Sequence, residues 1–282
     1  MKHILAILCL CVCSSMLSAQ EPSVRATLFG LGRVRQLDTY LSPIEYRGPQ
    51  FFFINENTRP TRLLHERVSF QSTVQIDFSS TEPASEKATF LGGNFDYAAA
   101  WHYRFFGTPY GTLPTDRSSR FSLAAGPQLS GLVGGLYNTR NGNNPAQAYL
   151  DVHLAASVQA GFIFRLRKMP VCLRDQLDVP LIGAMFTPAY GQSYYEIFSL
   201  GHYDHNVRAA HPFNAPSFRN KFTVDLPFRR STLRVGYLVD VRQSHVNDLR
   251  RHAYSHAFVI GWVRSVSLLP PVRYSATDGH TR

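Results

Sequence analysis

The stretch LDVHLAASVQAGFIFRL, residues 150–166, alternates between apolar side chains and polar or small ones. Its even positions are all apolar, whereas its odd positions include Asp151, Ser157 and Gln159. Successive side chains of a β-strand point to opposite faces of the sheet. The stretch therefore predicts a long strand with one apolar face and one polar face.

The same alternation recurs in residues 67–78, 91–105, 221–228 and 232–242. Most of these stretches are longer than the usual strand of about five or six residues. They suit the ~9–11 residues with which a tilted strand crosses a bilayer. Their polar faces carry Gly, Ser, Gln, Asp and Arg, as the interior of a membrane barrel does. The pattern favours an all-β fold, an antiparallel transmembrane β-barrel, over a soluble β-sandwich, which also alternates.

The connections between these strands alternate in length, as short periplasmic turns and long external loops do in bacterial barrels. If the last strand, near 252–267, runs toward the periplasm, the short turns 167–170 and 229–231 are periplasmic. The external loops are then 135–147, 187–216 and 244–251. Continuing toward the N-terminus gives strands near 23–35, 47–55, 66–78, 89–105 and 119–134. We expect about ten strands, within a range of eight to twelve, and both termini in the periplasm.

Residues 1–19 have the organisation of a secretory signal peptide: a positive start, a short apolar run and small residues up to Ala19. We therefore expect cleavage after Ala19, a single barrel domain over residues 20–282, and a location in the bacterial outer membrane. A lipid-anchored Cys13 is the alternative, although small residues do not precede it as a lipoprotein signal requires.

The composition limits the cofactors and partners that the chain is expected to have. Cys172 is the only cysteine beyond the signal peptide, so the mature chain has no intramolecular disulfide and no C-x-x-C metal or redox pair. We expect no cofactor. The formal net charge is +10, which can indicate nucleic-acid binding. Because the chain is expected to be exported, we expect its partners to be the anionic lipid head groups of the outer membrane. We expect no nucleic acid as a partner.

Four segments are distinctive: LDTYLSPIEYRGP (37–49), YNTRNGNNPAQA (137–148), PAYGQSYYEIFSLGHYDHNV (188–207) and YSHAFVIGW (254–262). They resemble segments of a family of bacterial cell-envelope proteins known only as a domain of unknown function. The resemblance covers nearly the whole mature chain. It implies an outer-membrane location and a barrel-like β fold. It implies no activity, and no catalytic residues are carried over.

Two groups of residues are candidates for chemistry. His252, Ser255 and His256 lie near the C-terminal strand, where some outer-membrane hydrolases place His and Ser. A nucleophile needs a base within hydrogen-bond reach, but His252 and Ser255 point to opposite faces of a strand. We therefore assign no catalytic residue.

The second group lies in the long external loop and consists of Tyr194, Tyr195, Glu196, His202, Asp204 and His205. Imidazole and carboxylate groups suit zinc, and the tyrosines and Glu196 suit a recognition surface. The simpler interpretation is a loop that packs on its own aromatic residues over the barrel mouth. We assign no metal site.

Three functional hypotheses remain open. The first is a non-enzymatic outer-membrane barrel that serves envelope integrity, surface recognition or the narrow passage of small solutes. The second is a hydrolase at the rim that acts on lipid or peptide. The third is a soluble periplasmic β-protein that binds a ligand. In a membrane barrel, arginine should be poorly tolerated at the lipid-facing Val158 and better tolerated at Ser157, which faces the lumen.

Overall fold

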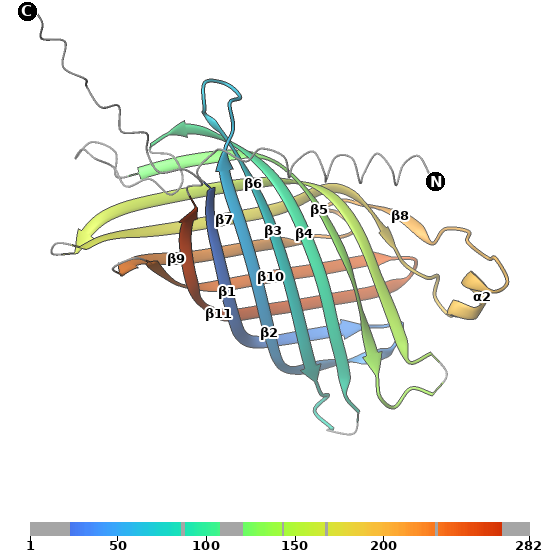
Figure 1. The fold of residues 1–282 in the computed structure, drawn as a ribbon. Helices are drawn as coiled ribbons and strands as arrows, with labels where there is room; N and C mark the ends of the chain where they lie inside the picture. Colours follow the sequence, from blue (N-terminus) through green and yellow to red (C-terminus); the bar gives the residue numbers. More distant parts are fainter. Residues whose placement is uncertain are drawn as a thin grey trace, which may run out of the picture.

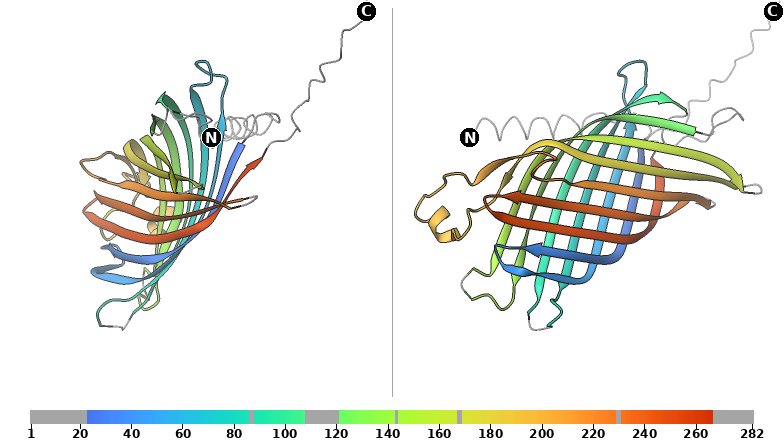
Figure 2. Two further views of the ribbon diagram at one scale, coloured as in Figure 1. Left: turned by 90° about the vertical axis from the view of Figure 1, so that its left-hand side faces the viewer. Right: turned by 180° about the vertical axis from the view of Figure 1, so that it is seen from behind.

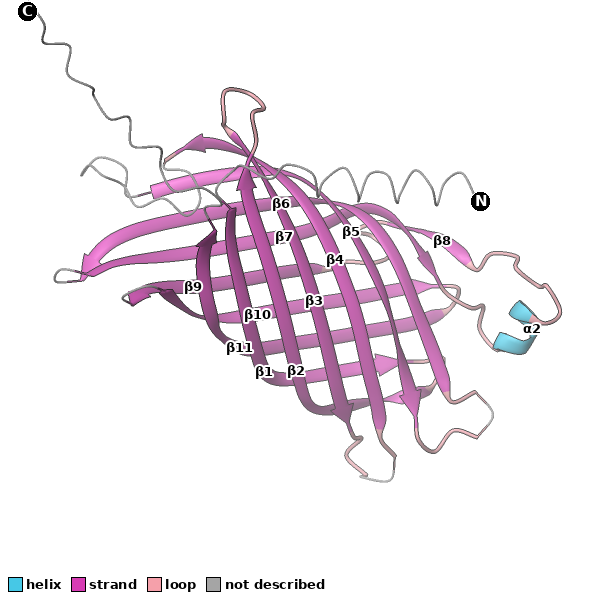
Figure 3. Ribbon diagram, in the orientation of Figure 1, coloured by secondary structure: helices cyan, strands magenta, loops and turns pink. Residues whose placement is uncertain are grey.

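The computed structural model describes residues 23–85, 88–107, 121–142, 144–166, 169–228 and 231–266. The predicted signal peptide and most of the connection between the strands predicted near 89–105 and 119–134 lie outside these residues. The described chain is almost entirely β-strand, with one short helix, α2 (Tyr194–Phe198) (Figure 3). None of its helices is long and apolar enough to span a bilayer. The strands are β1 (Ser23–Asp38), β2 (Ser42–Pro60), β3 (Val68–Thr81), β4 (Phe90–Phe106), β5 (Phe121–Asn138), β6 (Ala146–Leu166), β7 (Met169–Phe186), β8 (Val207–Ala210), β9 (Phe218–Phe228), β10 (Ser231–Val246) and β11 (Leu249–Val266).

Ten of these strands form a closed antiparallel barrel, as the alternation predicts. Each strand pairs with its neighbour along the chain, β7 pairs with β9, and β1 closes the sheet by pairing with β11 from Ser23↔Val266 to Asp38↔Arg251. The short β8 adds to one end of β7. The strands of the two walls run in different directions in projection (Figures 1 and 2), because closing a barrel requires strongly tilted strands.

The two ends of the barrel differ. One end, called here the terminal end, holds Ser23 and Val266, the first and last described residues. The other, called here the loop end, carries the 187–217 connection with α2 and β8, which extend beyond the strands (Figures 1 and 2).

The outer and inner faces of the wall have the polarity that the alternation predicts. On β6, the apolar Leu150, Val152, Leu154 and Val158 are 38 to 51% exposed on the outer face. The interleaved Asp151 and Ser157 are buried in the lumen. A water-soluble protein buries its apolar face, so this inverted arrangement is typical of a barrel that faces lipid.

Two predicted boundaries are wrong. The second strand, predicted near 47–55, covers Ser42–Pro60. Its first half contains Pro43 and Pro49, which suggest a loop, but β2 pairs with β3 only from Gln50 onward. Before Gln50, the described contact on that side is a single bridge between Arg47 and Glu82, just beyond the end of β3. Pro43 and Pro49 lie outside this bridge, where proline is tolerated because no ladder hydrogen bond is lost.

The predicted external loop 244–251 is instead a tight hairpin. β10 runs to Val246 and β11 begins at Leu249. Asn247 and Asp248 connect them with φ values of 54° and 59°. Positive φ at both central residues is the geometry of a type I′ turn, whose twist matches that of the flanking strands. The contrast between short and long connections therefore holds for 187–217 but not for every connection at the loop end.

Candidate functional site

The six residues of the predicted loop surface lie in two successive segments of the loop. Tyr194, Tyr195 and Glu196 lie on α2, and the exposed His202, Asp204 and His205 follow in the turn after it. The described residues contain no group of three His, Cys, Asp or Glu side chains that could hold a metal ion. His202 contributes its backbone to the loop: its N–H donates to Glu196 O at 3.0 Å, and its carbonyl accepts from Gln192 Nε2 at 2.9 Å.

Tyr194 anchors the loop to the barrel. Its hydroxyl donates to Gln147 Oε1 at 2.9 Å and accepts from the Ala148 N–H at 2.7 Å. Its ring stacks on Phe198 at a centroid distance of 6.0 Å and meets Tyr40 edge-on at 5.7 Å. Burial raises the pKa of the Tyr194 hydroxyl to about 12, so this group stays a neutral donor. The loop is thus packed on its own aromatic residues, as the simpler interpretation expects.

Glu196 closes the first turn of α2 as part of a capping box. Ser193 Oγ accepts from the Glu196 N–H, and the Glu196 carboxylate accepts from the N–H and the hydroxyl of Ser193 at 2.7 and 2.9 Å. These hydrogen bonds lower the pKa of Glu196. Its carboxylate is therefore engaged in holding the loop conformation.

The histidines near the C-terminus do not form a hydrolase site with Ser255. Ser255 is buried on the lumen side of β11, whereas His256 lies on the exposed outer face and contacts Tyr237 Oη through Nδ1 at 2.9 Å. His252 is on the outer face as well, stacked on Tyr254. The opposite orientation of His252 and Ser255 that the strand period predicts is confirmed.

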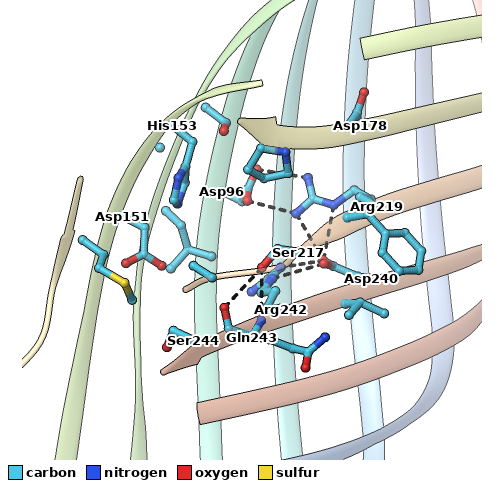
Figure 4. A pocket seen from close by; sticks show the side chains of 18 of the residues that line it. Asp96, Asp151, His153, Asp178, Ser217, Arg219, Asp240, Arg242, Gln243 and Ser244 are labelled. Atoms are coloured by element: carbon cyan, nitrogen blue, oxygen red, sulfur yellow. Dashed lines mark hydrogen bonds and ion pairs between the residues drawn. The ribbon is translucent and has the colours of Figure 1, made fainter. Parts of the chain in front are cut away.

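The most highly connected polar group lies inside the barrel and was not predicted as a site. Figure 4 shows Arg219 of β9 between Asp96 of β4 and Asp240 of β10. The Arg219 guanidinium donates two hydrogen bonds to Asp96, at 3.2 and 2.9 Å. Arg242 donates to Asp240 at 2.7 Å and to Asp77 of β3 at 3.3 Å. β3 and β4 are neighbours in one wall, and β9 and β10 are neighbours in the opposite wall, so the Arg219–Asp96 and Arg242–Asp77 pairs tie the two walls together.

A second ionic group fills the lumen nearer the terminal end. Arg234, which is 1% exposed, donates to Asp225 through Nε at 2.6 Å and Nη2 at 2.9 Å, and to Glu56 at 3.0 Å. Lys221 also pairs with Glu56, and Arg174 pairs with Asp225 at 2.9 Å. Buried charges require such partners, because an unpaired charge in a low-dielectric interior is strongly disfavoured.

A layer of amides adjoins the second ionic group. Gln159 Nε2 donates to Gln71 Oε1 at 2.8 Å, and both glutamines bond to Gln176 Oε1 at 3.2 Å. These three residues, called here the glutamine layer, come from β3, β6 and β7. β6 and β7 are neighbours in the sheet, and the layer joins them to β3, which pairs with neither.

His102, Ser157 and Asp178 adjoin this layer and contain the residue types of a hydrolase. Ser157 Oγ donates to Asp178 at 2.5 Å and contacts His102 Nε2 at 2.8 Å. In a catalytic triad the histidine lies between serine and carboxylate, but here the serine lies between the other two. Ser157 and His102 are wholly buried, so the group has a structural role.

The loop end of the lumen is closed by apolar and aromatic side chains. Tyr46 stacks on Phe90 at a centroid distance of 3.6 Å, within a buried cluster that also contains Leu41, Leu136 and Tyr149. Tyr149 Oη donates across the lumen to Asp38 at 2.8 Å.

The chain belongs to the family described as "Protein of unknown function (DUF3316)", which matches residues 4–273. No curated protein matches it. Three solved structures are similar in fold. The transport unit of the autotransporter AIDA-I from Escherichia coli has 9% identity and a TM-score of 0.44, over 87% of this chain and 92% of that chain.

The outer membrane protease OmpT from Escherichia coli has 9% identity and a TM-score of 0.41, over 88% of this chain and 98% of that chain. The translocator domain of the autotransporter NalP from Neisseria meningitidis has 10% identity and a TM-score of 0.41, over 93% of this chain and 95% of that chain. The likeness concerns the fold and extends to no activity.

Proposed function

We propose that this member of the family is a bacterial outer-membrane barrel that conducts no solute and acts through the surface at its loop end. The observation that carries the proposal is the set of ion pairs and hydrogen bonds that cross the lumen. Arg219–Asp96, Arg242–Asp77 and the glutamine layer connect opposite walls at different depths. Outer-membrane lipids are then the partners of the apolar outer face.

The width of the barrel supports a sealed lumen. Barrels with few strands have interiors that side chains can fill, whereas about 16–18 strands leave an aqueous channel. Here the buried Gln71, Gln75, Arg234 and Glu56 occupy the centre. Opening a passage would break several charge-assisted hydrogen bonds at once. Narrow solute passage, one of the hypotheses from the sequence, is the variant that this interior favours least.

The loop end carries the features of a recognition surface. Its 187–217 connection is held to the β10–β11 turn by Asn247 Nδ2, which donates to His205 O at 2.9 Å. Tyr195 and Tyr203 are 65% and 63% exposed on this anchored loop. Aromatic side chains on an ordered surface are enriched at protein interfaces.

Electrical recording in planar lipid bilayers tests the proposal. We expect the purified, heat-modifiable protein to give no stable current steps. A triple variant, Gln71→Ala/Gln159→Ala/Gln176→Ala, removes the glutamine layer and tests whether these amides contribute to the seal. Uniform current steps from the wild-type protein would refute the sealed lumen. A folded triple variant that stays silent would show that the ion pairs close the lumen without the glutamine layer.

A further inference from the structure

The lumen contains a cavity at the terminal end that neither the seal nor the loop surface explains. Its volume is about 330 Å³, against about 80 Å³ for the cavity on the loop side of the lumen (Figure 4). Gln159 and Gln176 of the glutamine layer line it, so the layer forms part of its wall. The cavity is large enough for a small polar group together with water.

The wall of this cavity is predominantly cationic. Three acidic side chains line it, namely Glu56, Glu66 and Asp175. Twice as many basic ones do so, namely Arg59, Arg67, Arg104, Arg174, Lys221 and Arg234. Asp225 does not line the cavity itself, but it pairs with Arg174 and Arg234, which do. Even with Asp225 included, the formal charge around the cavity is positive, and a concave surface of one sign concentrates ions of the other.

Two of the arginines are available to a ligand. Arg104 of β4 reaches only the backbone carbonyl of Glu66, at 3.5 Å. Arg67 donates to the hydroxyl of Tyr103 at 3.3 Å. Neither guanidinium has a carboxylate within ion-pair distance in the described part of the chain. The Arg104 N–H also bonds to Arg67 O at 2.8 Å, so the two residues are neighbours.

Thr58 provides an independent indication of a ligand. It lines the same cavity and is 3% exposed, yet its Oγ1 has no hydrogen-bond partner among the residues that the structure describes. A buried hydroxyl without a partner is destabilising by about 1–3 kcal/mol. A hydroxyl can donate to an anionic oxygen, and a bound anion would satisfy it.

We propose that this cavity binds a phosphate-class oxyanion through Arg104 and Arg67, with Thr58 donating a further hydrogen bond. The planar fork of a guanidinium matches two oxygens of a phosphate group. Two sources share this chemistry: a free phosphate ion that enters from the terminal end, and the head group of a phospholipid. The inference does not depend on the proposed function, because an anion can bind this cavity whether or not the lumen conducts.

Calorimetric titration of the full-length protein in an uncharged detergent and phosphate-free buffer tests the site. The probes are inorganic phosphate and, separately, a short-chain phosphatidic acid below its micellar concentration. We expect saturable binding of at least one of them. Thr58→Val should weaken it by about tenfold, the effect of losing one hydrogen bond to a charged group. Arg104→Gln removes the charge and the two-pronged contact, so it should weaken binding by more than tenfold.

Arg264→Gln is the matched control. Arg264 lies near the same end of the barrel but is exposed on the outer face of β11, so its loss lowers the net charge equally and should leave binding unchanged. Heat-modifiable migration verifies that each variant is folded. Binding of phosphate identifies a free-anion site, and binding of phosphatidic acid alone identifies a head-group site. Absence of saturable binding for both probes, or equal weakening by Arg264→Gln, would overturn the proposal, whatever the bilayer recordings show.

Discussion

At the scale of single residues, Asp240 is the lumen carboxylate that pairs with both Arg219 and Arg242. It accepts hydrogen bonds from Gln75, Arg219 and Arg242, and it is 3% exposed. Asp240→Ala would leave the two guanidiniums with only Asp96 and Asp77. Removing one partner of a buried ion pair costs roughly 3–5 kcal/mol, so we expect the free energy of unfolding to fall by about that amount in a urea titration.

Asp204→Ala is the control for this substitution. Asp204 is an exposed carboxylate in the 187–217 connection, for which the described structure shows no hydrogen bond or ion pair. Its loss should change the free energy of unfolding by less than about 0.5 kcal/mol. If both substitutions had the same small effect, the ion pairs across the lumen would contribute nothing to holding the walls together.

At the scale of elements, α2 depends on the ionised carboxylate of Glu196. The folded-state pKa of Glu196 is lowered by the hydrogen bonds from Ser193. The stabilisation is therefore fully present above the ordinary glutamate pKa of about 4.3 and is lost as the pH falls through the lowered value. We expect hydrogen exchange of the α2 amides, corrected for intrinsic rates, to accelerate below about pH 4.

Two variants separate the capping box from general effects of acid. Glu196→Ala should exchange rapidly at every pH, because both hydrogen bonds to Ser193 are lost. Asp204→Ala, in the same loop, should follow the wild-type profile. A Glu196→Ala protein with wild-type exchange at neutral pH would contradict the role of the cap.

At the scale of the whole molecule, the face of the barrel on which a side chain lies predicts whether an arginine there impairs insertion into the membrane. Val158 is on the outer face of β6, where arginine should cost ~2–4 kcal/mol if the position is near the bilayer midplane. The sequence alone suggests Ser157→Arg as the lumen-facing control for Val158→Arg. Ser157 is unsuitable, because it is wholly buried and hydrogen-bonded to His102 and Asp178. Ser122 lines the larger cavity at the terminal end, so Ser122→Arg serves as the control instead.

We therefore expect Val158→Arg to reduce the yield of heat-modifiable protein in reconstituted bilayers, while Ser122→Arg inserts like the wild-type protein. Equal insertion of both variants would contradict the assignment of Val158 to the lipid face. Equal failure of both would indicate that the cationic cavity does not accept a further arginine.

The sequence by itself determined the wall of the barrel. The alternation in residues 150–166 specifies a strand and its two faces, because the direction of a side chain in a strand depends only on the local backbone. The even number of strands and the long 187–217 connection also follow from local patterns. The boundaries of β2 did not, since its prolines are tolerated only because residues 42–49 lack a partner on β3.

The contents of the lumen were decided by the tertiary structure alone. The alternation places Asp77, Asp240 and Arg242 on polar faces, but it contains nothing that pairs one wall with the opposite one. Arg219 meets Asp96 across 123 positions of the chain. That meeting depends on the number of strands, their tilt and the register in which β1 closes on β11. The ion pairs across the lumen and the cationic cavity exist only once the sheet has closed.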